Sequence, residues 1–270
     1  QVDPFIVMDV MEAAARAEAN GRHIIHMEVG QPSTPAPAAA LKALGQELAE
    51  PLGYTVALGL PALREAIAGL YRRWYGVELD PGRVVITAGS SGAFLLAFAA
   101  LFEAGGRVAG GEPGYPSYRQ ILRAMSVEPV GMPTRFENRY QPVPADIPAD
   151  VQGVMLASPG NPSGTMLDHA ALAALAARAA EIGAALISDE IYHGLSYGAR
   201  CVSALEVTDD VVVINSFSKF FSMTGWRIGW MVVPPDMVRT MDRLAANMFI
   251  CPPHASQLAA LAALSPEGEA

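Results

Sequence analysis

The chain has 270 residues, of which 51% are hydrophobic, with a formal net charge of −9 and an isoelectric point near 5.0. This length allows one large domain, or one domain with part of another, to bury a hydrophobic core. The negative charge argues against nucleic acid or an anionic membrane as a partner, so an anionic ligand would need a local binding site.

The cysteines and histidines give no sign of metal or disulfide chemistry. Cys201 and Cys251 stand far apart in the sequence and form no paired motif, which is typical of a reducing compartment. The five histidines lack metal-ligand spacing, and no apolar stretch reaches the length of a membrane span. Since no signal peptide is visible either, we expect a cytoplasmic protein with no bound metal.

The first half of the chain alternates between helical and extended patterns. Apolar residues at helical spacing predict helices over 5–19, 35–49 and 61–76, the last two opened by proline. A short strand is expected over 23–29. The pattern then predicts strand 83–89, helix 92–105, strand 107–113, helix 116–126 and a short strand near 127–131.

The second half continues this alternation after a loop over 133–150. It predicts strands over 153–158, 184–190, 211–216 and 227–233, a helix over 167–183, and a helical pattern from 255 that stops at a Pro-Glu-Gly-Glu loop. Too few residues separate the last two strands in the sequence for an easy helical crossover, so these strands could run antiparallel. The whole pattern predicts an α/β fold with a mostly parallel sheet covered by helices on both faces.

One lysine occupies an unusual position. Among the 18 basic residues only Lys42 and Lys219 are lysines, and Lys219 lies in the apolar run SFSKFFSMTGWRIGW over 216–230. An amine can lose its proton and attack a carbonyl carbon, whereas the guanidinium of arginine stays charged. A surface lysine that extends its ammonium group to water is the alternative explanation, and Lys219 alone does not decide between them.

Other unusual residues follow the strands, where this architecture binds ligands. Small residues and hydroxyls at Ser90 and Ser91 precede a helix and suit an anion, Tyr115 lies at a rigid turn, and Asn161 lies in a Pro-Gly-rich loop. Asp189 at a strand end would be costly to bury without a cation. Each feature has an ordinary structural explanation, but together with Lys219 and Arg227 they describe a pocket for pyridoxal phosphate.

The chain resembles the class I/II aminotransferases of the aspartate aminotransferase superfamily, which have fold type I. The resemblance runs along the whole chain and rests on an ordered set of motifs: VGQPSTPAP, YTVALGLPALREAIA, TAGSSGA, EPGYPSY, SPGNPSG, SDEIYHGLSY and the lysine segment SFSKFFSMTGWRIGW. The resemblance implies a pyridoxal-phosphate-dependent enzyme that exchanges an amino group between an amino acid and a 2-oxo acid.

The resemblance also implies roles for individual residues. Lys219 would hold the cofactor as a Schiff base and move the α-proton, while Asp189 would pair with the pyridinium nitrogen. Asn161 and Tyr192 would contact the ring hydroxyl, and Tyr115 would lie on the ring face. The phosphate would be bound by Ser90, Ser91, Ser216 and Arg227. The substrate carboxylate would lie beside Gly30 and Asn161. Tyr54 would reach the phosphate of a neighbouring subunit, which implies a homodimer with shared active sites.

The chain departs from the family pattern after Lys219. Family members carry a C-terminal small domain with an arginine that binds the substrate carboxylate, whereas the last arginine here is Arg243. We therefore expect that residues 1–42 belong to the small domain, that residues 43–270 form the large cofactor-binding domain, and that the C-terminal small domain is absent from this chain. On that expectation, the chain alone should hold pyridoxal phosphate but transaminate poorly.

Two other functions remain open from the sequence. A carbon–sulfur β-lyase uses the same fold and the same cofactor pocket, because the choice of reaction depends on substrate geometry. A cofactor-binding sensor domain without turnover is the second alternative, although no basic DNA-binding segment precedes the fold in this chain.

Overall fold

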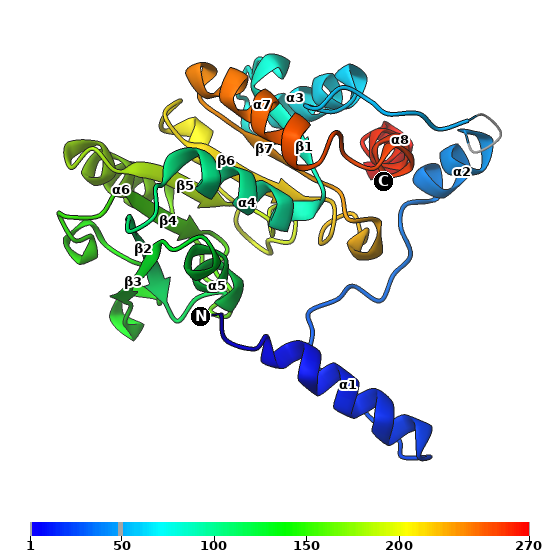
Figure 1. The fold of residues 1–270 in the computed structure, drawn as a ribbon, viewed down its shortest axis with the longest axis horizontal. Coiled ribbons are helices and arrows are strands. Elements are labelled where there is room, and N and C mark those ends of the chain that lie inside the picture. The colour runs from blue at the N-terminus through cyan, green and yellow to red at the C-terminus, as the bar shows by residue number, and fades with distance from the viewer. Residues whose placement is uncertain (1, 48–50, 270) are drawn as a thin grey trace.

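A computed structural model describes residues 2–47 and 51–269, whose strands form one seven-stranded sheet (Figure 1). The strands are β1 Val84–Thr87, β2 Arg107–Glu112, β3 Glu128–Pro133, β4 Gly153–Ala157, β5 Ala185–Asp189, β6 Val212–Ser216 and β7 Gly229–Val232. Their order in the sheet is β1-β7-β6-β5-β4-β2-β3. Strand β7 runs antiparallel to both of its neighbours, as its short connection to β6 indicates, and the other pairs are parallel.

Helices cover both faces of this sheet, apart from α1, which projects away from it. The helices of the described residues are α1 Ile6–Ala19, α2 Ala38–Glu47, α3 Pro61–Tyr75, α4 Gly89–Leu101, α5 Pro116–Ala124, α6 His169–Glu181, α7 Val238–Met248, α8 His254–Ala263 and α9 Pro266–Glu269. Because successive strand residues point to opposite faces, Val85 belongs to one buried cluster, with residues of α4, α5 and α7, while Val84 and Ile86 belong to a second, with residues of α3, α6 and α8. The predicted α/β fold with a mostly parallel, doubly covered sheet is confirmed.

Three local expectations differ from the structure. The strand expected over 23–29 is wrong, because this segment lies in irregular chain with Ile25 and Met27 exposed and pairs with no described strand. No element was expected over 238–248, where α7 buries Met241 and Ala245 against α4. The Pro-Glu-Gly-Glu segment, expected as a loop, forms the short helix α9. The end of the helix expected over 35–49 lies outside the described residues.

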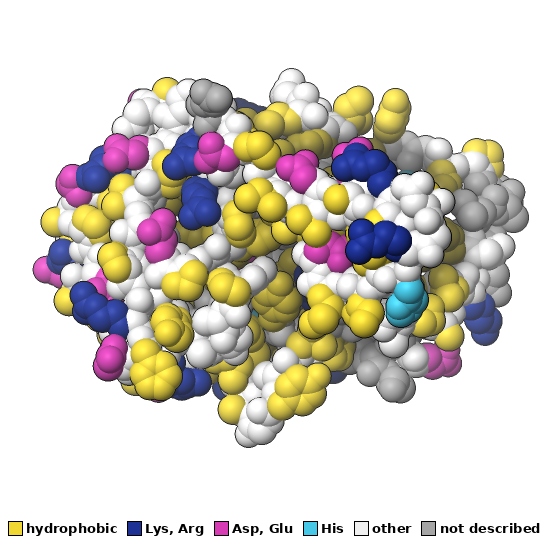
Figure 2. Space-filling model, turned by 90° about the horizontal axis from the view of Figure 1, so that it is seen from below, with side chains coloured by type: hydrophobic (Ala, Val, Ile, Leu, Met, Phe, Trp, Pro, Cys, Tyr) yellow, Lys and Arg dark blue, Asp and Glu magenta, His cyan; other side chains and the backbone are white. Residues whose placement is uncertain are grey.

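Helix α1 projects away from the sheet and its covering helices (Figure 1). It buries none of its residues, and its apolar side chains Ile6, Met8 and Val10 are exposed. The segment before it is attached through Asp3, which accepts hydrogen bonds from Gln120 and Arg123 on α5. Figure 2 shows the face seen from below, where many hydrophobic side chains lie at the surface among the charged ones.

No helix among the described residues is long and apolar enough to cross a membrane. No three histidine, cysteine, aspartate or glutamate side chains in residues 2–47 and 51–269 are grouped so that they could hold a metal ion.

Candidate active site

A cavity of about 420 Å³ lies at the carboxyl ends of the parallel strands, where open α/β sheets bind ligands. This volume is in the range of small-molecule sites. Nine of the residues singled out from the sequence line it: Gly30, Ser90, Ser91, Tyr115, Asn161, Asp189, Tyr192, Lys219 and Arg227. Residues far apart in the sequence therefore converge because their strands are neighbours in the sheet.

The Lys219 side chain enters this cavity from the segment that follows β6. Its ammonium group donates a 2.6 Å hydrogen bond to the carbonyl of Gly30 and lies 5.9 Å from the ring centre of Tyr192. Burial, and then the positive charge of Arg227, lower the pKa of Lys219. Both effects favour the neutral amine, which is the nucleophilic form.

Asp189 is the last residue of β5 and is almost completely buried at the base of the cavity. Its carboxylate accepts hydrogen bonds from the Tyr118 hydroxyl and, at 3.0 Å, from the Ile191 amide. Burial raises the pKa of Asp189 to about 6, and the Tyr118 hydrogen bond, the Ile191 amide and Lys219 oppose that rise. A cationic ligand atom beside this carboxylate would relieve the cost of burying it.

Arg227 and the start of α4 form the other end of the cavity. Arg227 adopts a left-handed backbone conformation with φ 49°, which is uncommon for a residue with a side chain, and its guanidinium donates to the carbonyl of Thr224 at 2.9 Å. Gly89 has φ 69°, and a Cβ there would lie 2.4 Å from the guanidinium. Glycine is therefore required for the guanidinium to lie against the amino end of α4, beside Ser90 and Ser91.

Aromatic and amide side chains complete the walls. Tyr115 immediately precedes α5 and meets Tyr118 edge-to-face, with ring centres 5.3 Å apart. The Asn161 amide donates to the Tyr192 hydroxyl at 3.4 Å, which joins the loop after β4 to the turn after β5. Burial raises the pKa of Tyr192, with the negative charge of Asp189 as the next cause, so this phenol keeps its proton at neutral pH.

Two of the expected site residues lie outside the cavity lining. The Ser216 hydroxyl is buried, within hydrogen-bond distance of the Ile228 carbonyl at 3.1 Å and of the Ser218 hydroxyl at 2.8 Å, and Ser218 is the serine that lines the cavity. Tyr54 is 83% exposed and does not line the cavity of its own chain.

The structure adds lining residues that were not expected, among them Tyr118 and Thr224. Tyr118 had a signal in the sequence. It stands three residues after Tyr115 at the start of a helix, and residues at that spacing share one helix face. Ser218 and Thr224 had only their nearness to Lys219 in the sequence.

The mostly parallel sheet, with a lysine amine, a buried carboxylate and an arginine beside a helix terminus at its carboxyl edge, places the chain among the fold type I α/β enzymes. The chain belongs to the aminotransferase class I and II family, whose sequence model matches residues 22–270. Members of this family in general depend on pyridoxal phosphate.

Individual relatives agree with this assignment. Valine–pyruvate aminotransferase from Mycobacterium tuberculosis is 48% identical, over 100% of this chain and 71% of its own length. A crystal structure of an aminotransferase from the same organism has a TM-score of 0.95 at 46% identity, covering 99% of this chain and 71% of its own. A Silicibacter pomeroyi structure, provisionally assigned as an aminotransferase, has a TM-score of 0.90 at 66% identity, covering 97% and 69%. The chain is accordingly an aminotransferase, an enzyme that exchanges an amino group between an amino acid and a 2-oxo acid.

Proposed function

We propose that this aminotransferase works with pyridoxal phosphate bonded to Lys219. The observation that carries the proposal is the shared cavity, in which an amine with a lowered pKa and a buried carboxylate lie with an arginine–helix anion site. These groups match an aldehyde, a ring nitrogen and a phosphate. When bound, the cofactor supplies an electrophilic carbon and a ring that accepts electron density from the substrate α-carbon.

The residues of the chain then have separate tasks. Lys219 bonds to the cofactor, and its released amine takes the α-proton and returns it. Asp189 keeps a proton on the ring nitrogen, because a buried carboxylate is stabilised by a cation beside it. Tyr115 packs against the ring, while Asn161 and Tyr192 hydrogen-bond its hydroxyl.

The phosphate end of the proposed site combines charge with hydrogen-bond donors. The Arg227 guanidinium, the hydroxyls of Ser90 and Ser91 and the amides at the start of α4 all border the same part of the cavity. The Ser216 hydroxyl points toward Ser218, so we propose that Ser216 acts on the phosphate through Ser218 and not directly.

The substrate is proposed to be an amino acid with an apolar side chain, paired with a small 2-oxo acid such as pyruvate. The cavity lining supports this proposal, since Val7, Val29 and Ile191 contribute apolar surface next to Gly30 and Asn161. The name of the valine–pyruvate relative agrees with it. A screen of amino donors with pyruvate and with 2-oxoglutarate checks the class, and valine should be among the best donors.

The same screen distinguishes transamination from carbon–sulfur β-elimination. Cystathionine, given without an amino acceptor, should yield no pyruvate. Rapid pyruvate release from cystathionine, together with slow exchange between valine and pyruvate, would identify a carbon–sulfur β-lyase. Cofactor binding with neither reaction would favour a sensor domain.

The attachment to Lys219 has a direct test. Borohydride reduction of the cofactor-loaded chain followed by peptide mapping should mark Lys219 alone. Lys219→Ala should abolish the mark and lower turnover by several orders of magnitude, because the nucleophile is lost. Lys42→Ala is the matched control, and a mark on Lys42 or no mark at all would contradict the assignment.

We also propose a homodimer in which Tyr54 serves the partner's cavity. An apolar surface supports this, formed by Tyr54 and Val56 together with 248–250, and the Thr55 amide contacts the Cys251 sulfur at 3.4 Å between these two segments. Mixing Tyr54→Phe with Lys219→Ala chains should restore activity in mixed dimers, because one of the two sites then has both native residues. A chain that stays monomeric at assay concentration would contradict the proposal.

We make two further proposals, one on the domains of the chain and one on its location in the cell. The exposed apolar side chains of α1 support assigning residues 1–42 to a second, smaller domain and residues 43–270 to the cofactor-binding domain. Limited proteolysis should then cut within 1–42 first.

The free thiols of Cys201 and Cys251 support a cytoplasmic location, which cell fractionation would check.

A further inference from the structure

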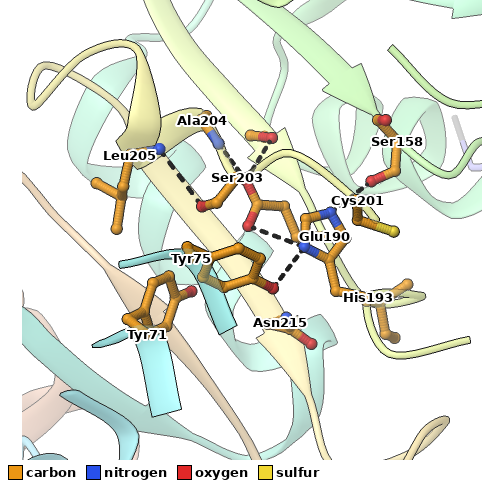
Figure 3. Close-up of polar contacts among 12 residues, drawn as sticks. Tyr71, Tyr75, Ser158, Glu190, His193, Cys201, Ser203, Ala204, Leu205 and Asn215 are labelled. Carbon is orange, nitrogen blue, oxygen red and sulfur yellow. Dashed lines mark hydrogen bonds and ion pairs between the residues drawn. The ribbon is translucent and has the colours of Figure 1, made fainter. Parts of the chain in front are cut away.

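A second group of polar side chains is buried around the turn that follows β5 (Figure 3). Glu190 and His193, which follow Asp189 in the turn after β5, are each 1% exposed. Tyr75 at the end of α3 lies 2.6 Å from Nδ1 of His193, and the carbonyl of Ser158 lies 2.9 Å from Nε2. None of these four residues lines the cavity, so catalysis does not explain why they are polar.

The partners of His193 fix the position of its ring hydrogen. A carbonyl oxygen only accepts hydrogen bonds, so Nε2 must carry the hydrogen that is shared with Ser158. Nδ1 of the neutral ring then presents a lone pair, which accepts the hydroxyl hydrogen of Tyr75. Burial lowers the pKa of His193 to about 4, which keeps the ring neutral at physiological pH.

Glu190 is consistent with the same arrangement. Its Oε1 accepts from the Ala204 amide at 2.7 Å and the Ser188 hydroxyl at 3.2 Å, whereas Oε2 has no hydrogen-bond partner among the described residues. Oε2 lies 3.6 Å from the His193 Nδ1 atom, which is too far for a hydrogen bond, and an ionised oxygen there would be repelled by the Nδ1 lone pair that already accepts from Tyr75. Burial raises the pKa of Glu190 to about 8, so this carboxyl group keeps its proton at neutral pH.

The other groups around this cluster do not change these protonation states. Tyr71 and Tyr75 on α3 have pKa values raised well above their ordinary value by burial, so both remain neutral. Asp189 raises the pKa of Glu190 further. From 200–206, Arg200 and Glu206 pair with each other at 2.8 Å and act on His193 in opposite directions. Burial likewise raises the pKa of the Cys201 thiol.

The His193 hydrogen bond joins the two segments that hold the proposed cofactor contacts. Ser158 begins the loop that carries Asn161, and His193 lies in the turn that follows Asp189 and carries Tyr192. In the cavity the same two segments meet again through Asn161 and Tyr192. We propose that His193, held in its Nε2–H form by Ser158 and Tyr75, is a positioning residue that fixes Asn161 against Tyr192. The role of Asn161 in this inference rests on the proposed function.

Two substitutions of His193 separate a positioning role from simple filling of space. In His193→Gln the amide nitrogen takes the place of Nε2 and still donates to Ser158, whereas the shorter amide in His193→Asn takes the place of Nδ1 and does not reach. Hydrogen exchange of the cofactor-free chain reports on the loop through the amides of Gly164 and Leu167, which bond to the Gly160 carbonyl and the Ser158 hydroxyl. Exposed His169→Asn is the control.

We expect His193→Asn to speed exchange of these two amides about tenfold and to raise the dissociation constant for pyridoxal phosphate by a similar factor, since one buried hydrogen bond is lost. His193→Gln should stay within about threefold of the unmodified chain in both measurements, because its hydrogen bond is kept. Equal effects from the two variants, or no effect from either, would overturn the proposal.

The ring hydrogen can also be observed without any substitution. The ¹⁵N shifts of His193 in the unmodified, cofactor-free chain should show a neutral ring with hydrogen on Nε2 from pH 6 to pH 8. Hydrogen on Nδ1, or a charged ring at pH 7, would refute the arrangement. The exchange and NMR measurements need no cofactor, so they stand even if the chain fails to bind pyridoxal phosphate, which would instead refute the proposed function.

Discussion

Asp189 and Glu190 are adjacent carboxyl groups, both buried, that lie in opposite environments. Asp189 faces the cavity, accepts two hydrogen bonds and senses the charge of Lys219, and its pKa is raised to about 6. Glu190 faces the protein interior beside a neutral histidine, and its pKa is raised to about 8. Burial is the largest cause of both shifts.

The difference shows that burial alone does not decide the charge of a carboxyl group. Consecutive residues at a strand end point to opposite sides. The Asp189 carboxyl group therefore reaches a cavity that can hold a cation, whereas the Glu190 carboxyl group lies near the lone pair of His193 Nδ1. At neutral pH we therefore expect Asp189 to be mainly ionised and Glu190 to be protonated. Three experiments test this contrast, from the largest expected effect to the smallest.

Asp189→Asn should have the largest effect. The variant keeps the shape of the side chain and removes the charge that is proposed to pair with the ring nitrogen. Loss of one partner of a buried ion pair commonly costs about 3–5 kcal/mol, so turnover should fall by two to three orders of magnitude or more, with weaker cofactor binding. Cofactor titration and steady-state kinetics measure both.

The control for this experiment is Asp210→Asn, which makes the same chemical change at an exposed position. It should leave cofactor binding and turnover unchanged. If Asp189→Asn kept a near-native rate, the cofactor ring would not be held protonated by this carboxylate. The different environments of Asp189 and Glu190 would then have no consequence for catalysis.

Glu190→Gln should change how stability depends on pH. The pKa of Glu190 is about 8 in the folded chain and near 4.5 when unfolded, so between these values only the folded state keeps the proton. The free energy of unfolding therefore falls as pH rises through this window. Burial lowers the pKa of His193 from 6.5 to about 4, so His193 makes the free energy of unfolding rise with pH between these values. This contribution ends at about pH 6.5.

The window from pH 6.5 to pH 8 isolates Glu190 from His193. There the unmodified, cofactor-free chain should lose about 2 kcal/mol more stability than Glu190→Gln, at about 1.4 kcal/mol per pH unit for one proton. Urea unfolding at several pH values gives the comparison, with exposed Glu181→Gln as the control. Parallel stability curves for Glu190→Gln and the unmodified chain would mean that Glu190 is already ionised at pH 6.5.

Tyr118→Phe should have the smallest effect. The Tyr118 hydroxyl donates to Asp189 and lowers its pKa, so removing it should raise the pKa of Asp189 above about 6, by one unit or less for a single hydrogen bond. The carboxyl ¹³C shift of Asp189 in the cofactor-free chain reports this change. Tyr140→Phe, at an exposed tyrosine, should not move that shift, and an unchanged or lower value in Tyr118→Phe would show that the hydroxyl does not stabilise the ionised form.

Much of the fold was predictable because its elements carry local signals. Strands such as 211–216 are short apolar runs, and helices such as 61–76 begin with proline and end at a glycine, here Gly76 in the left-handed conformation. The strand expected over 23–29 shows the limit of such signals. An apolar run becomes a strand only if another strand accepts its hydrogen bonds, and none of the described strands lies beside it.

The sequence by itself determined the α/β class, the family and the residues whose chemistry is unusual for their surroundings, above all Lys219 and Asp189. Motif order and the alternation of helix and strand are local properties of the chain, so they can be read without coordinates. Only the tertiary structure decided that Ser218 instead of Ser216 lines the cavity and that Tyr118 holds Asp189. Only the tertiary structure also brought Glu190 to His193 and Tyr75, because sheet neighbours and side-chain direction are set by packing between distant segments.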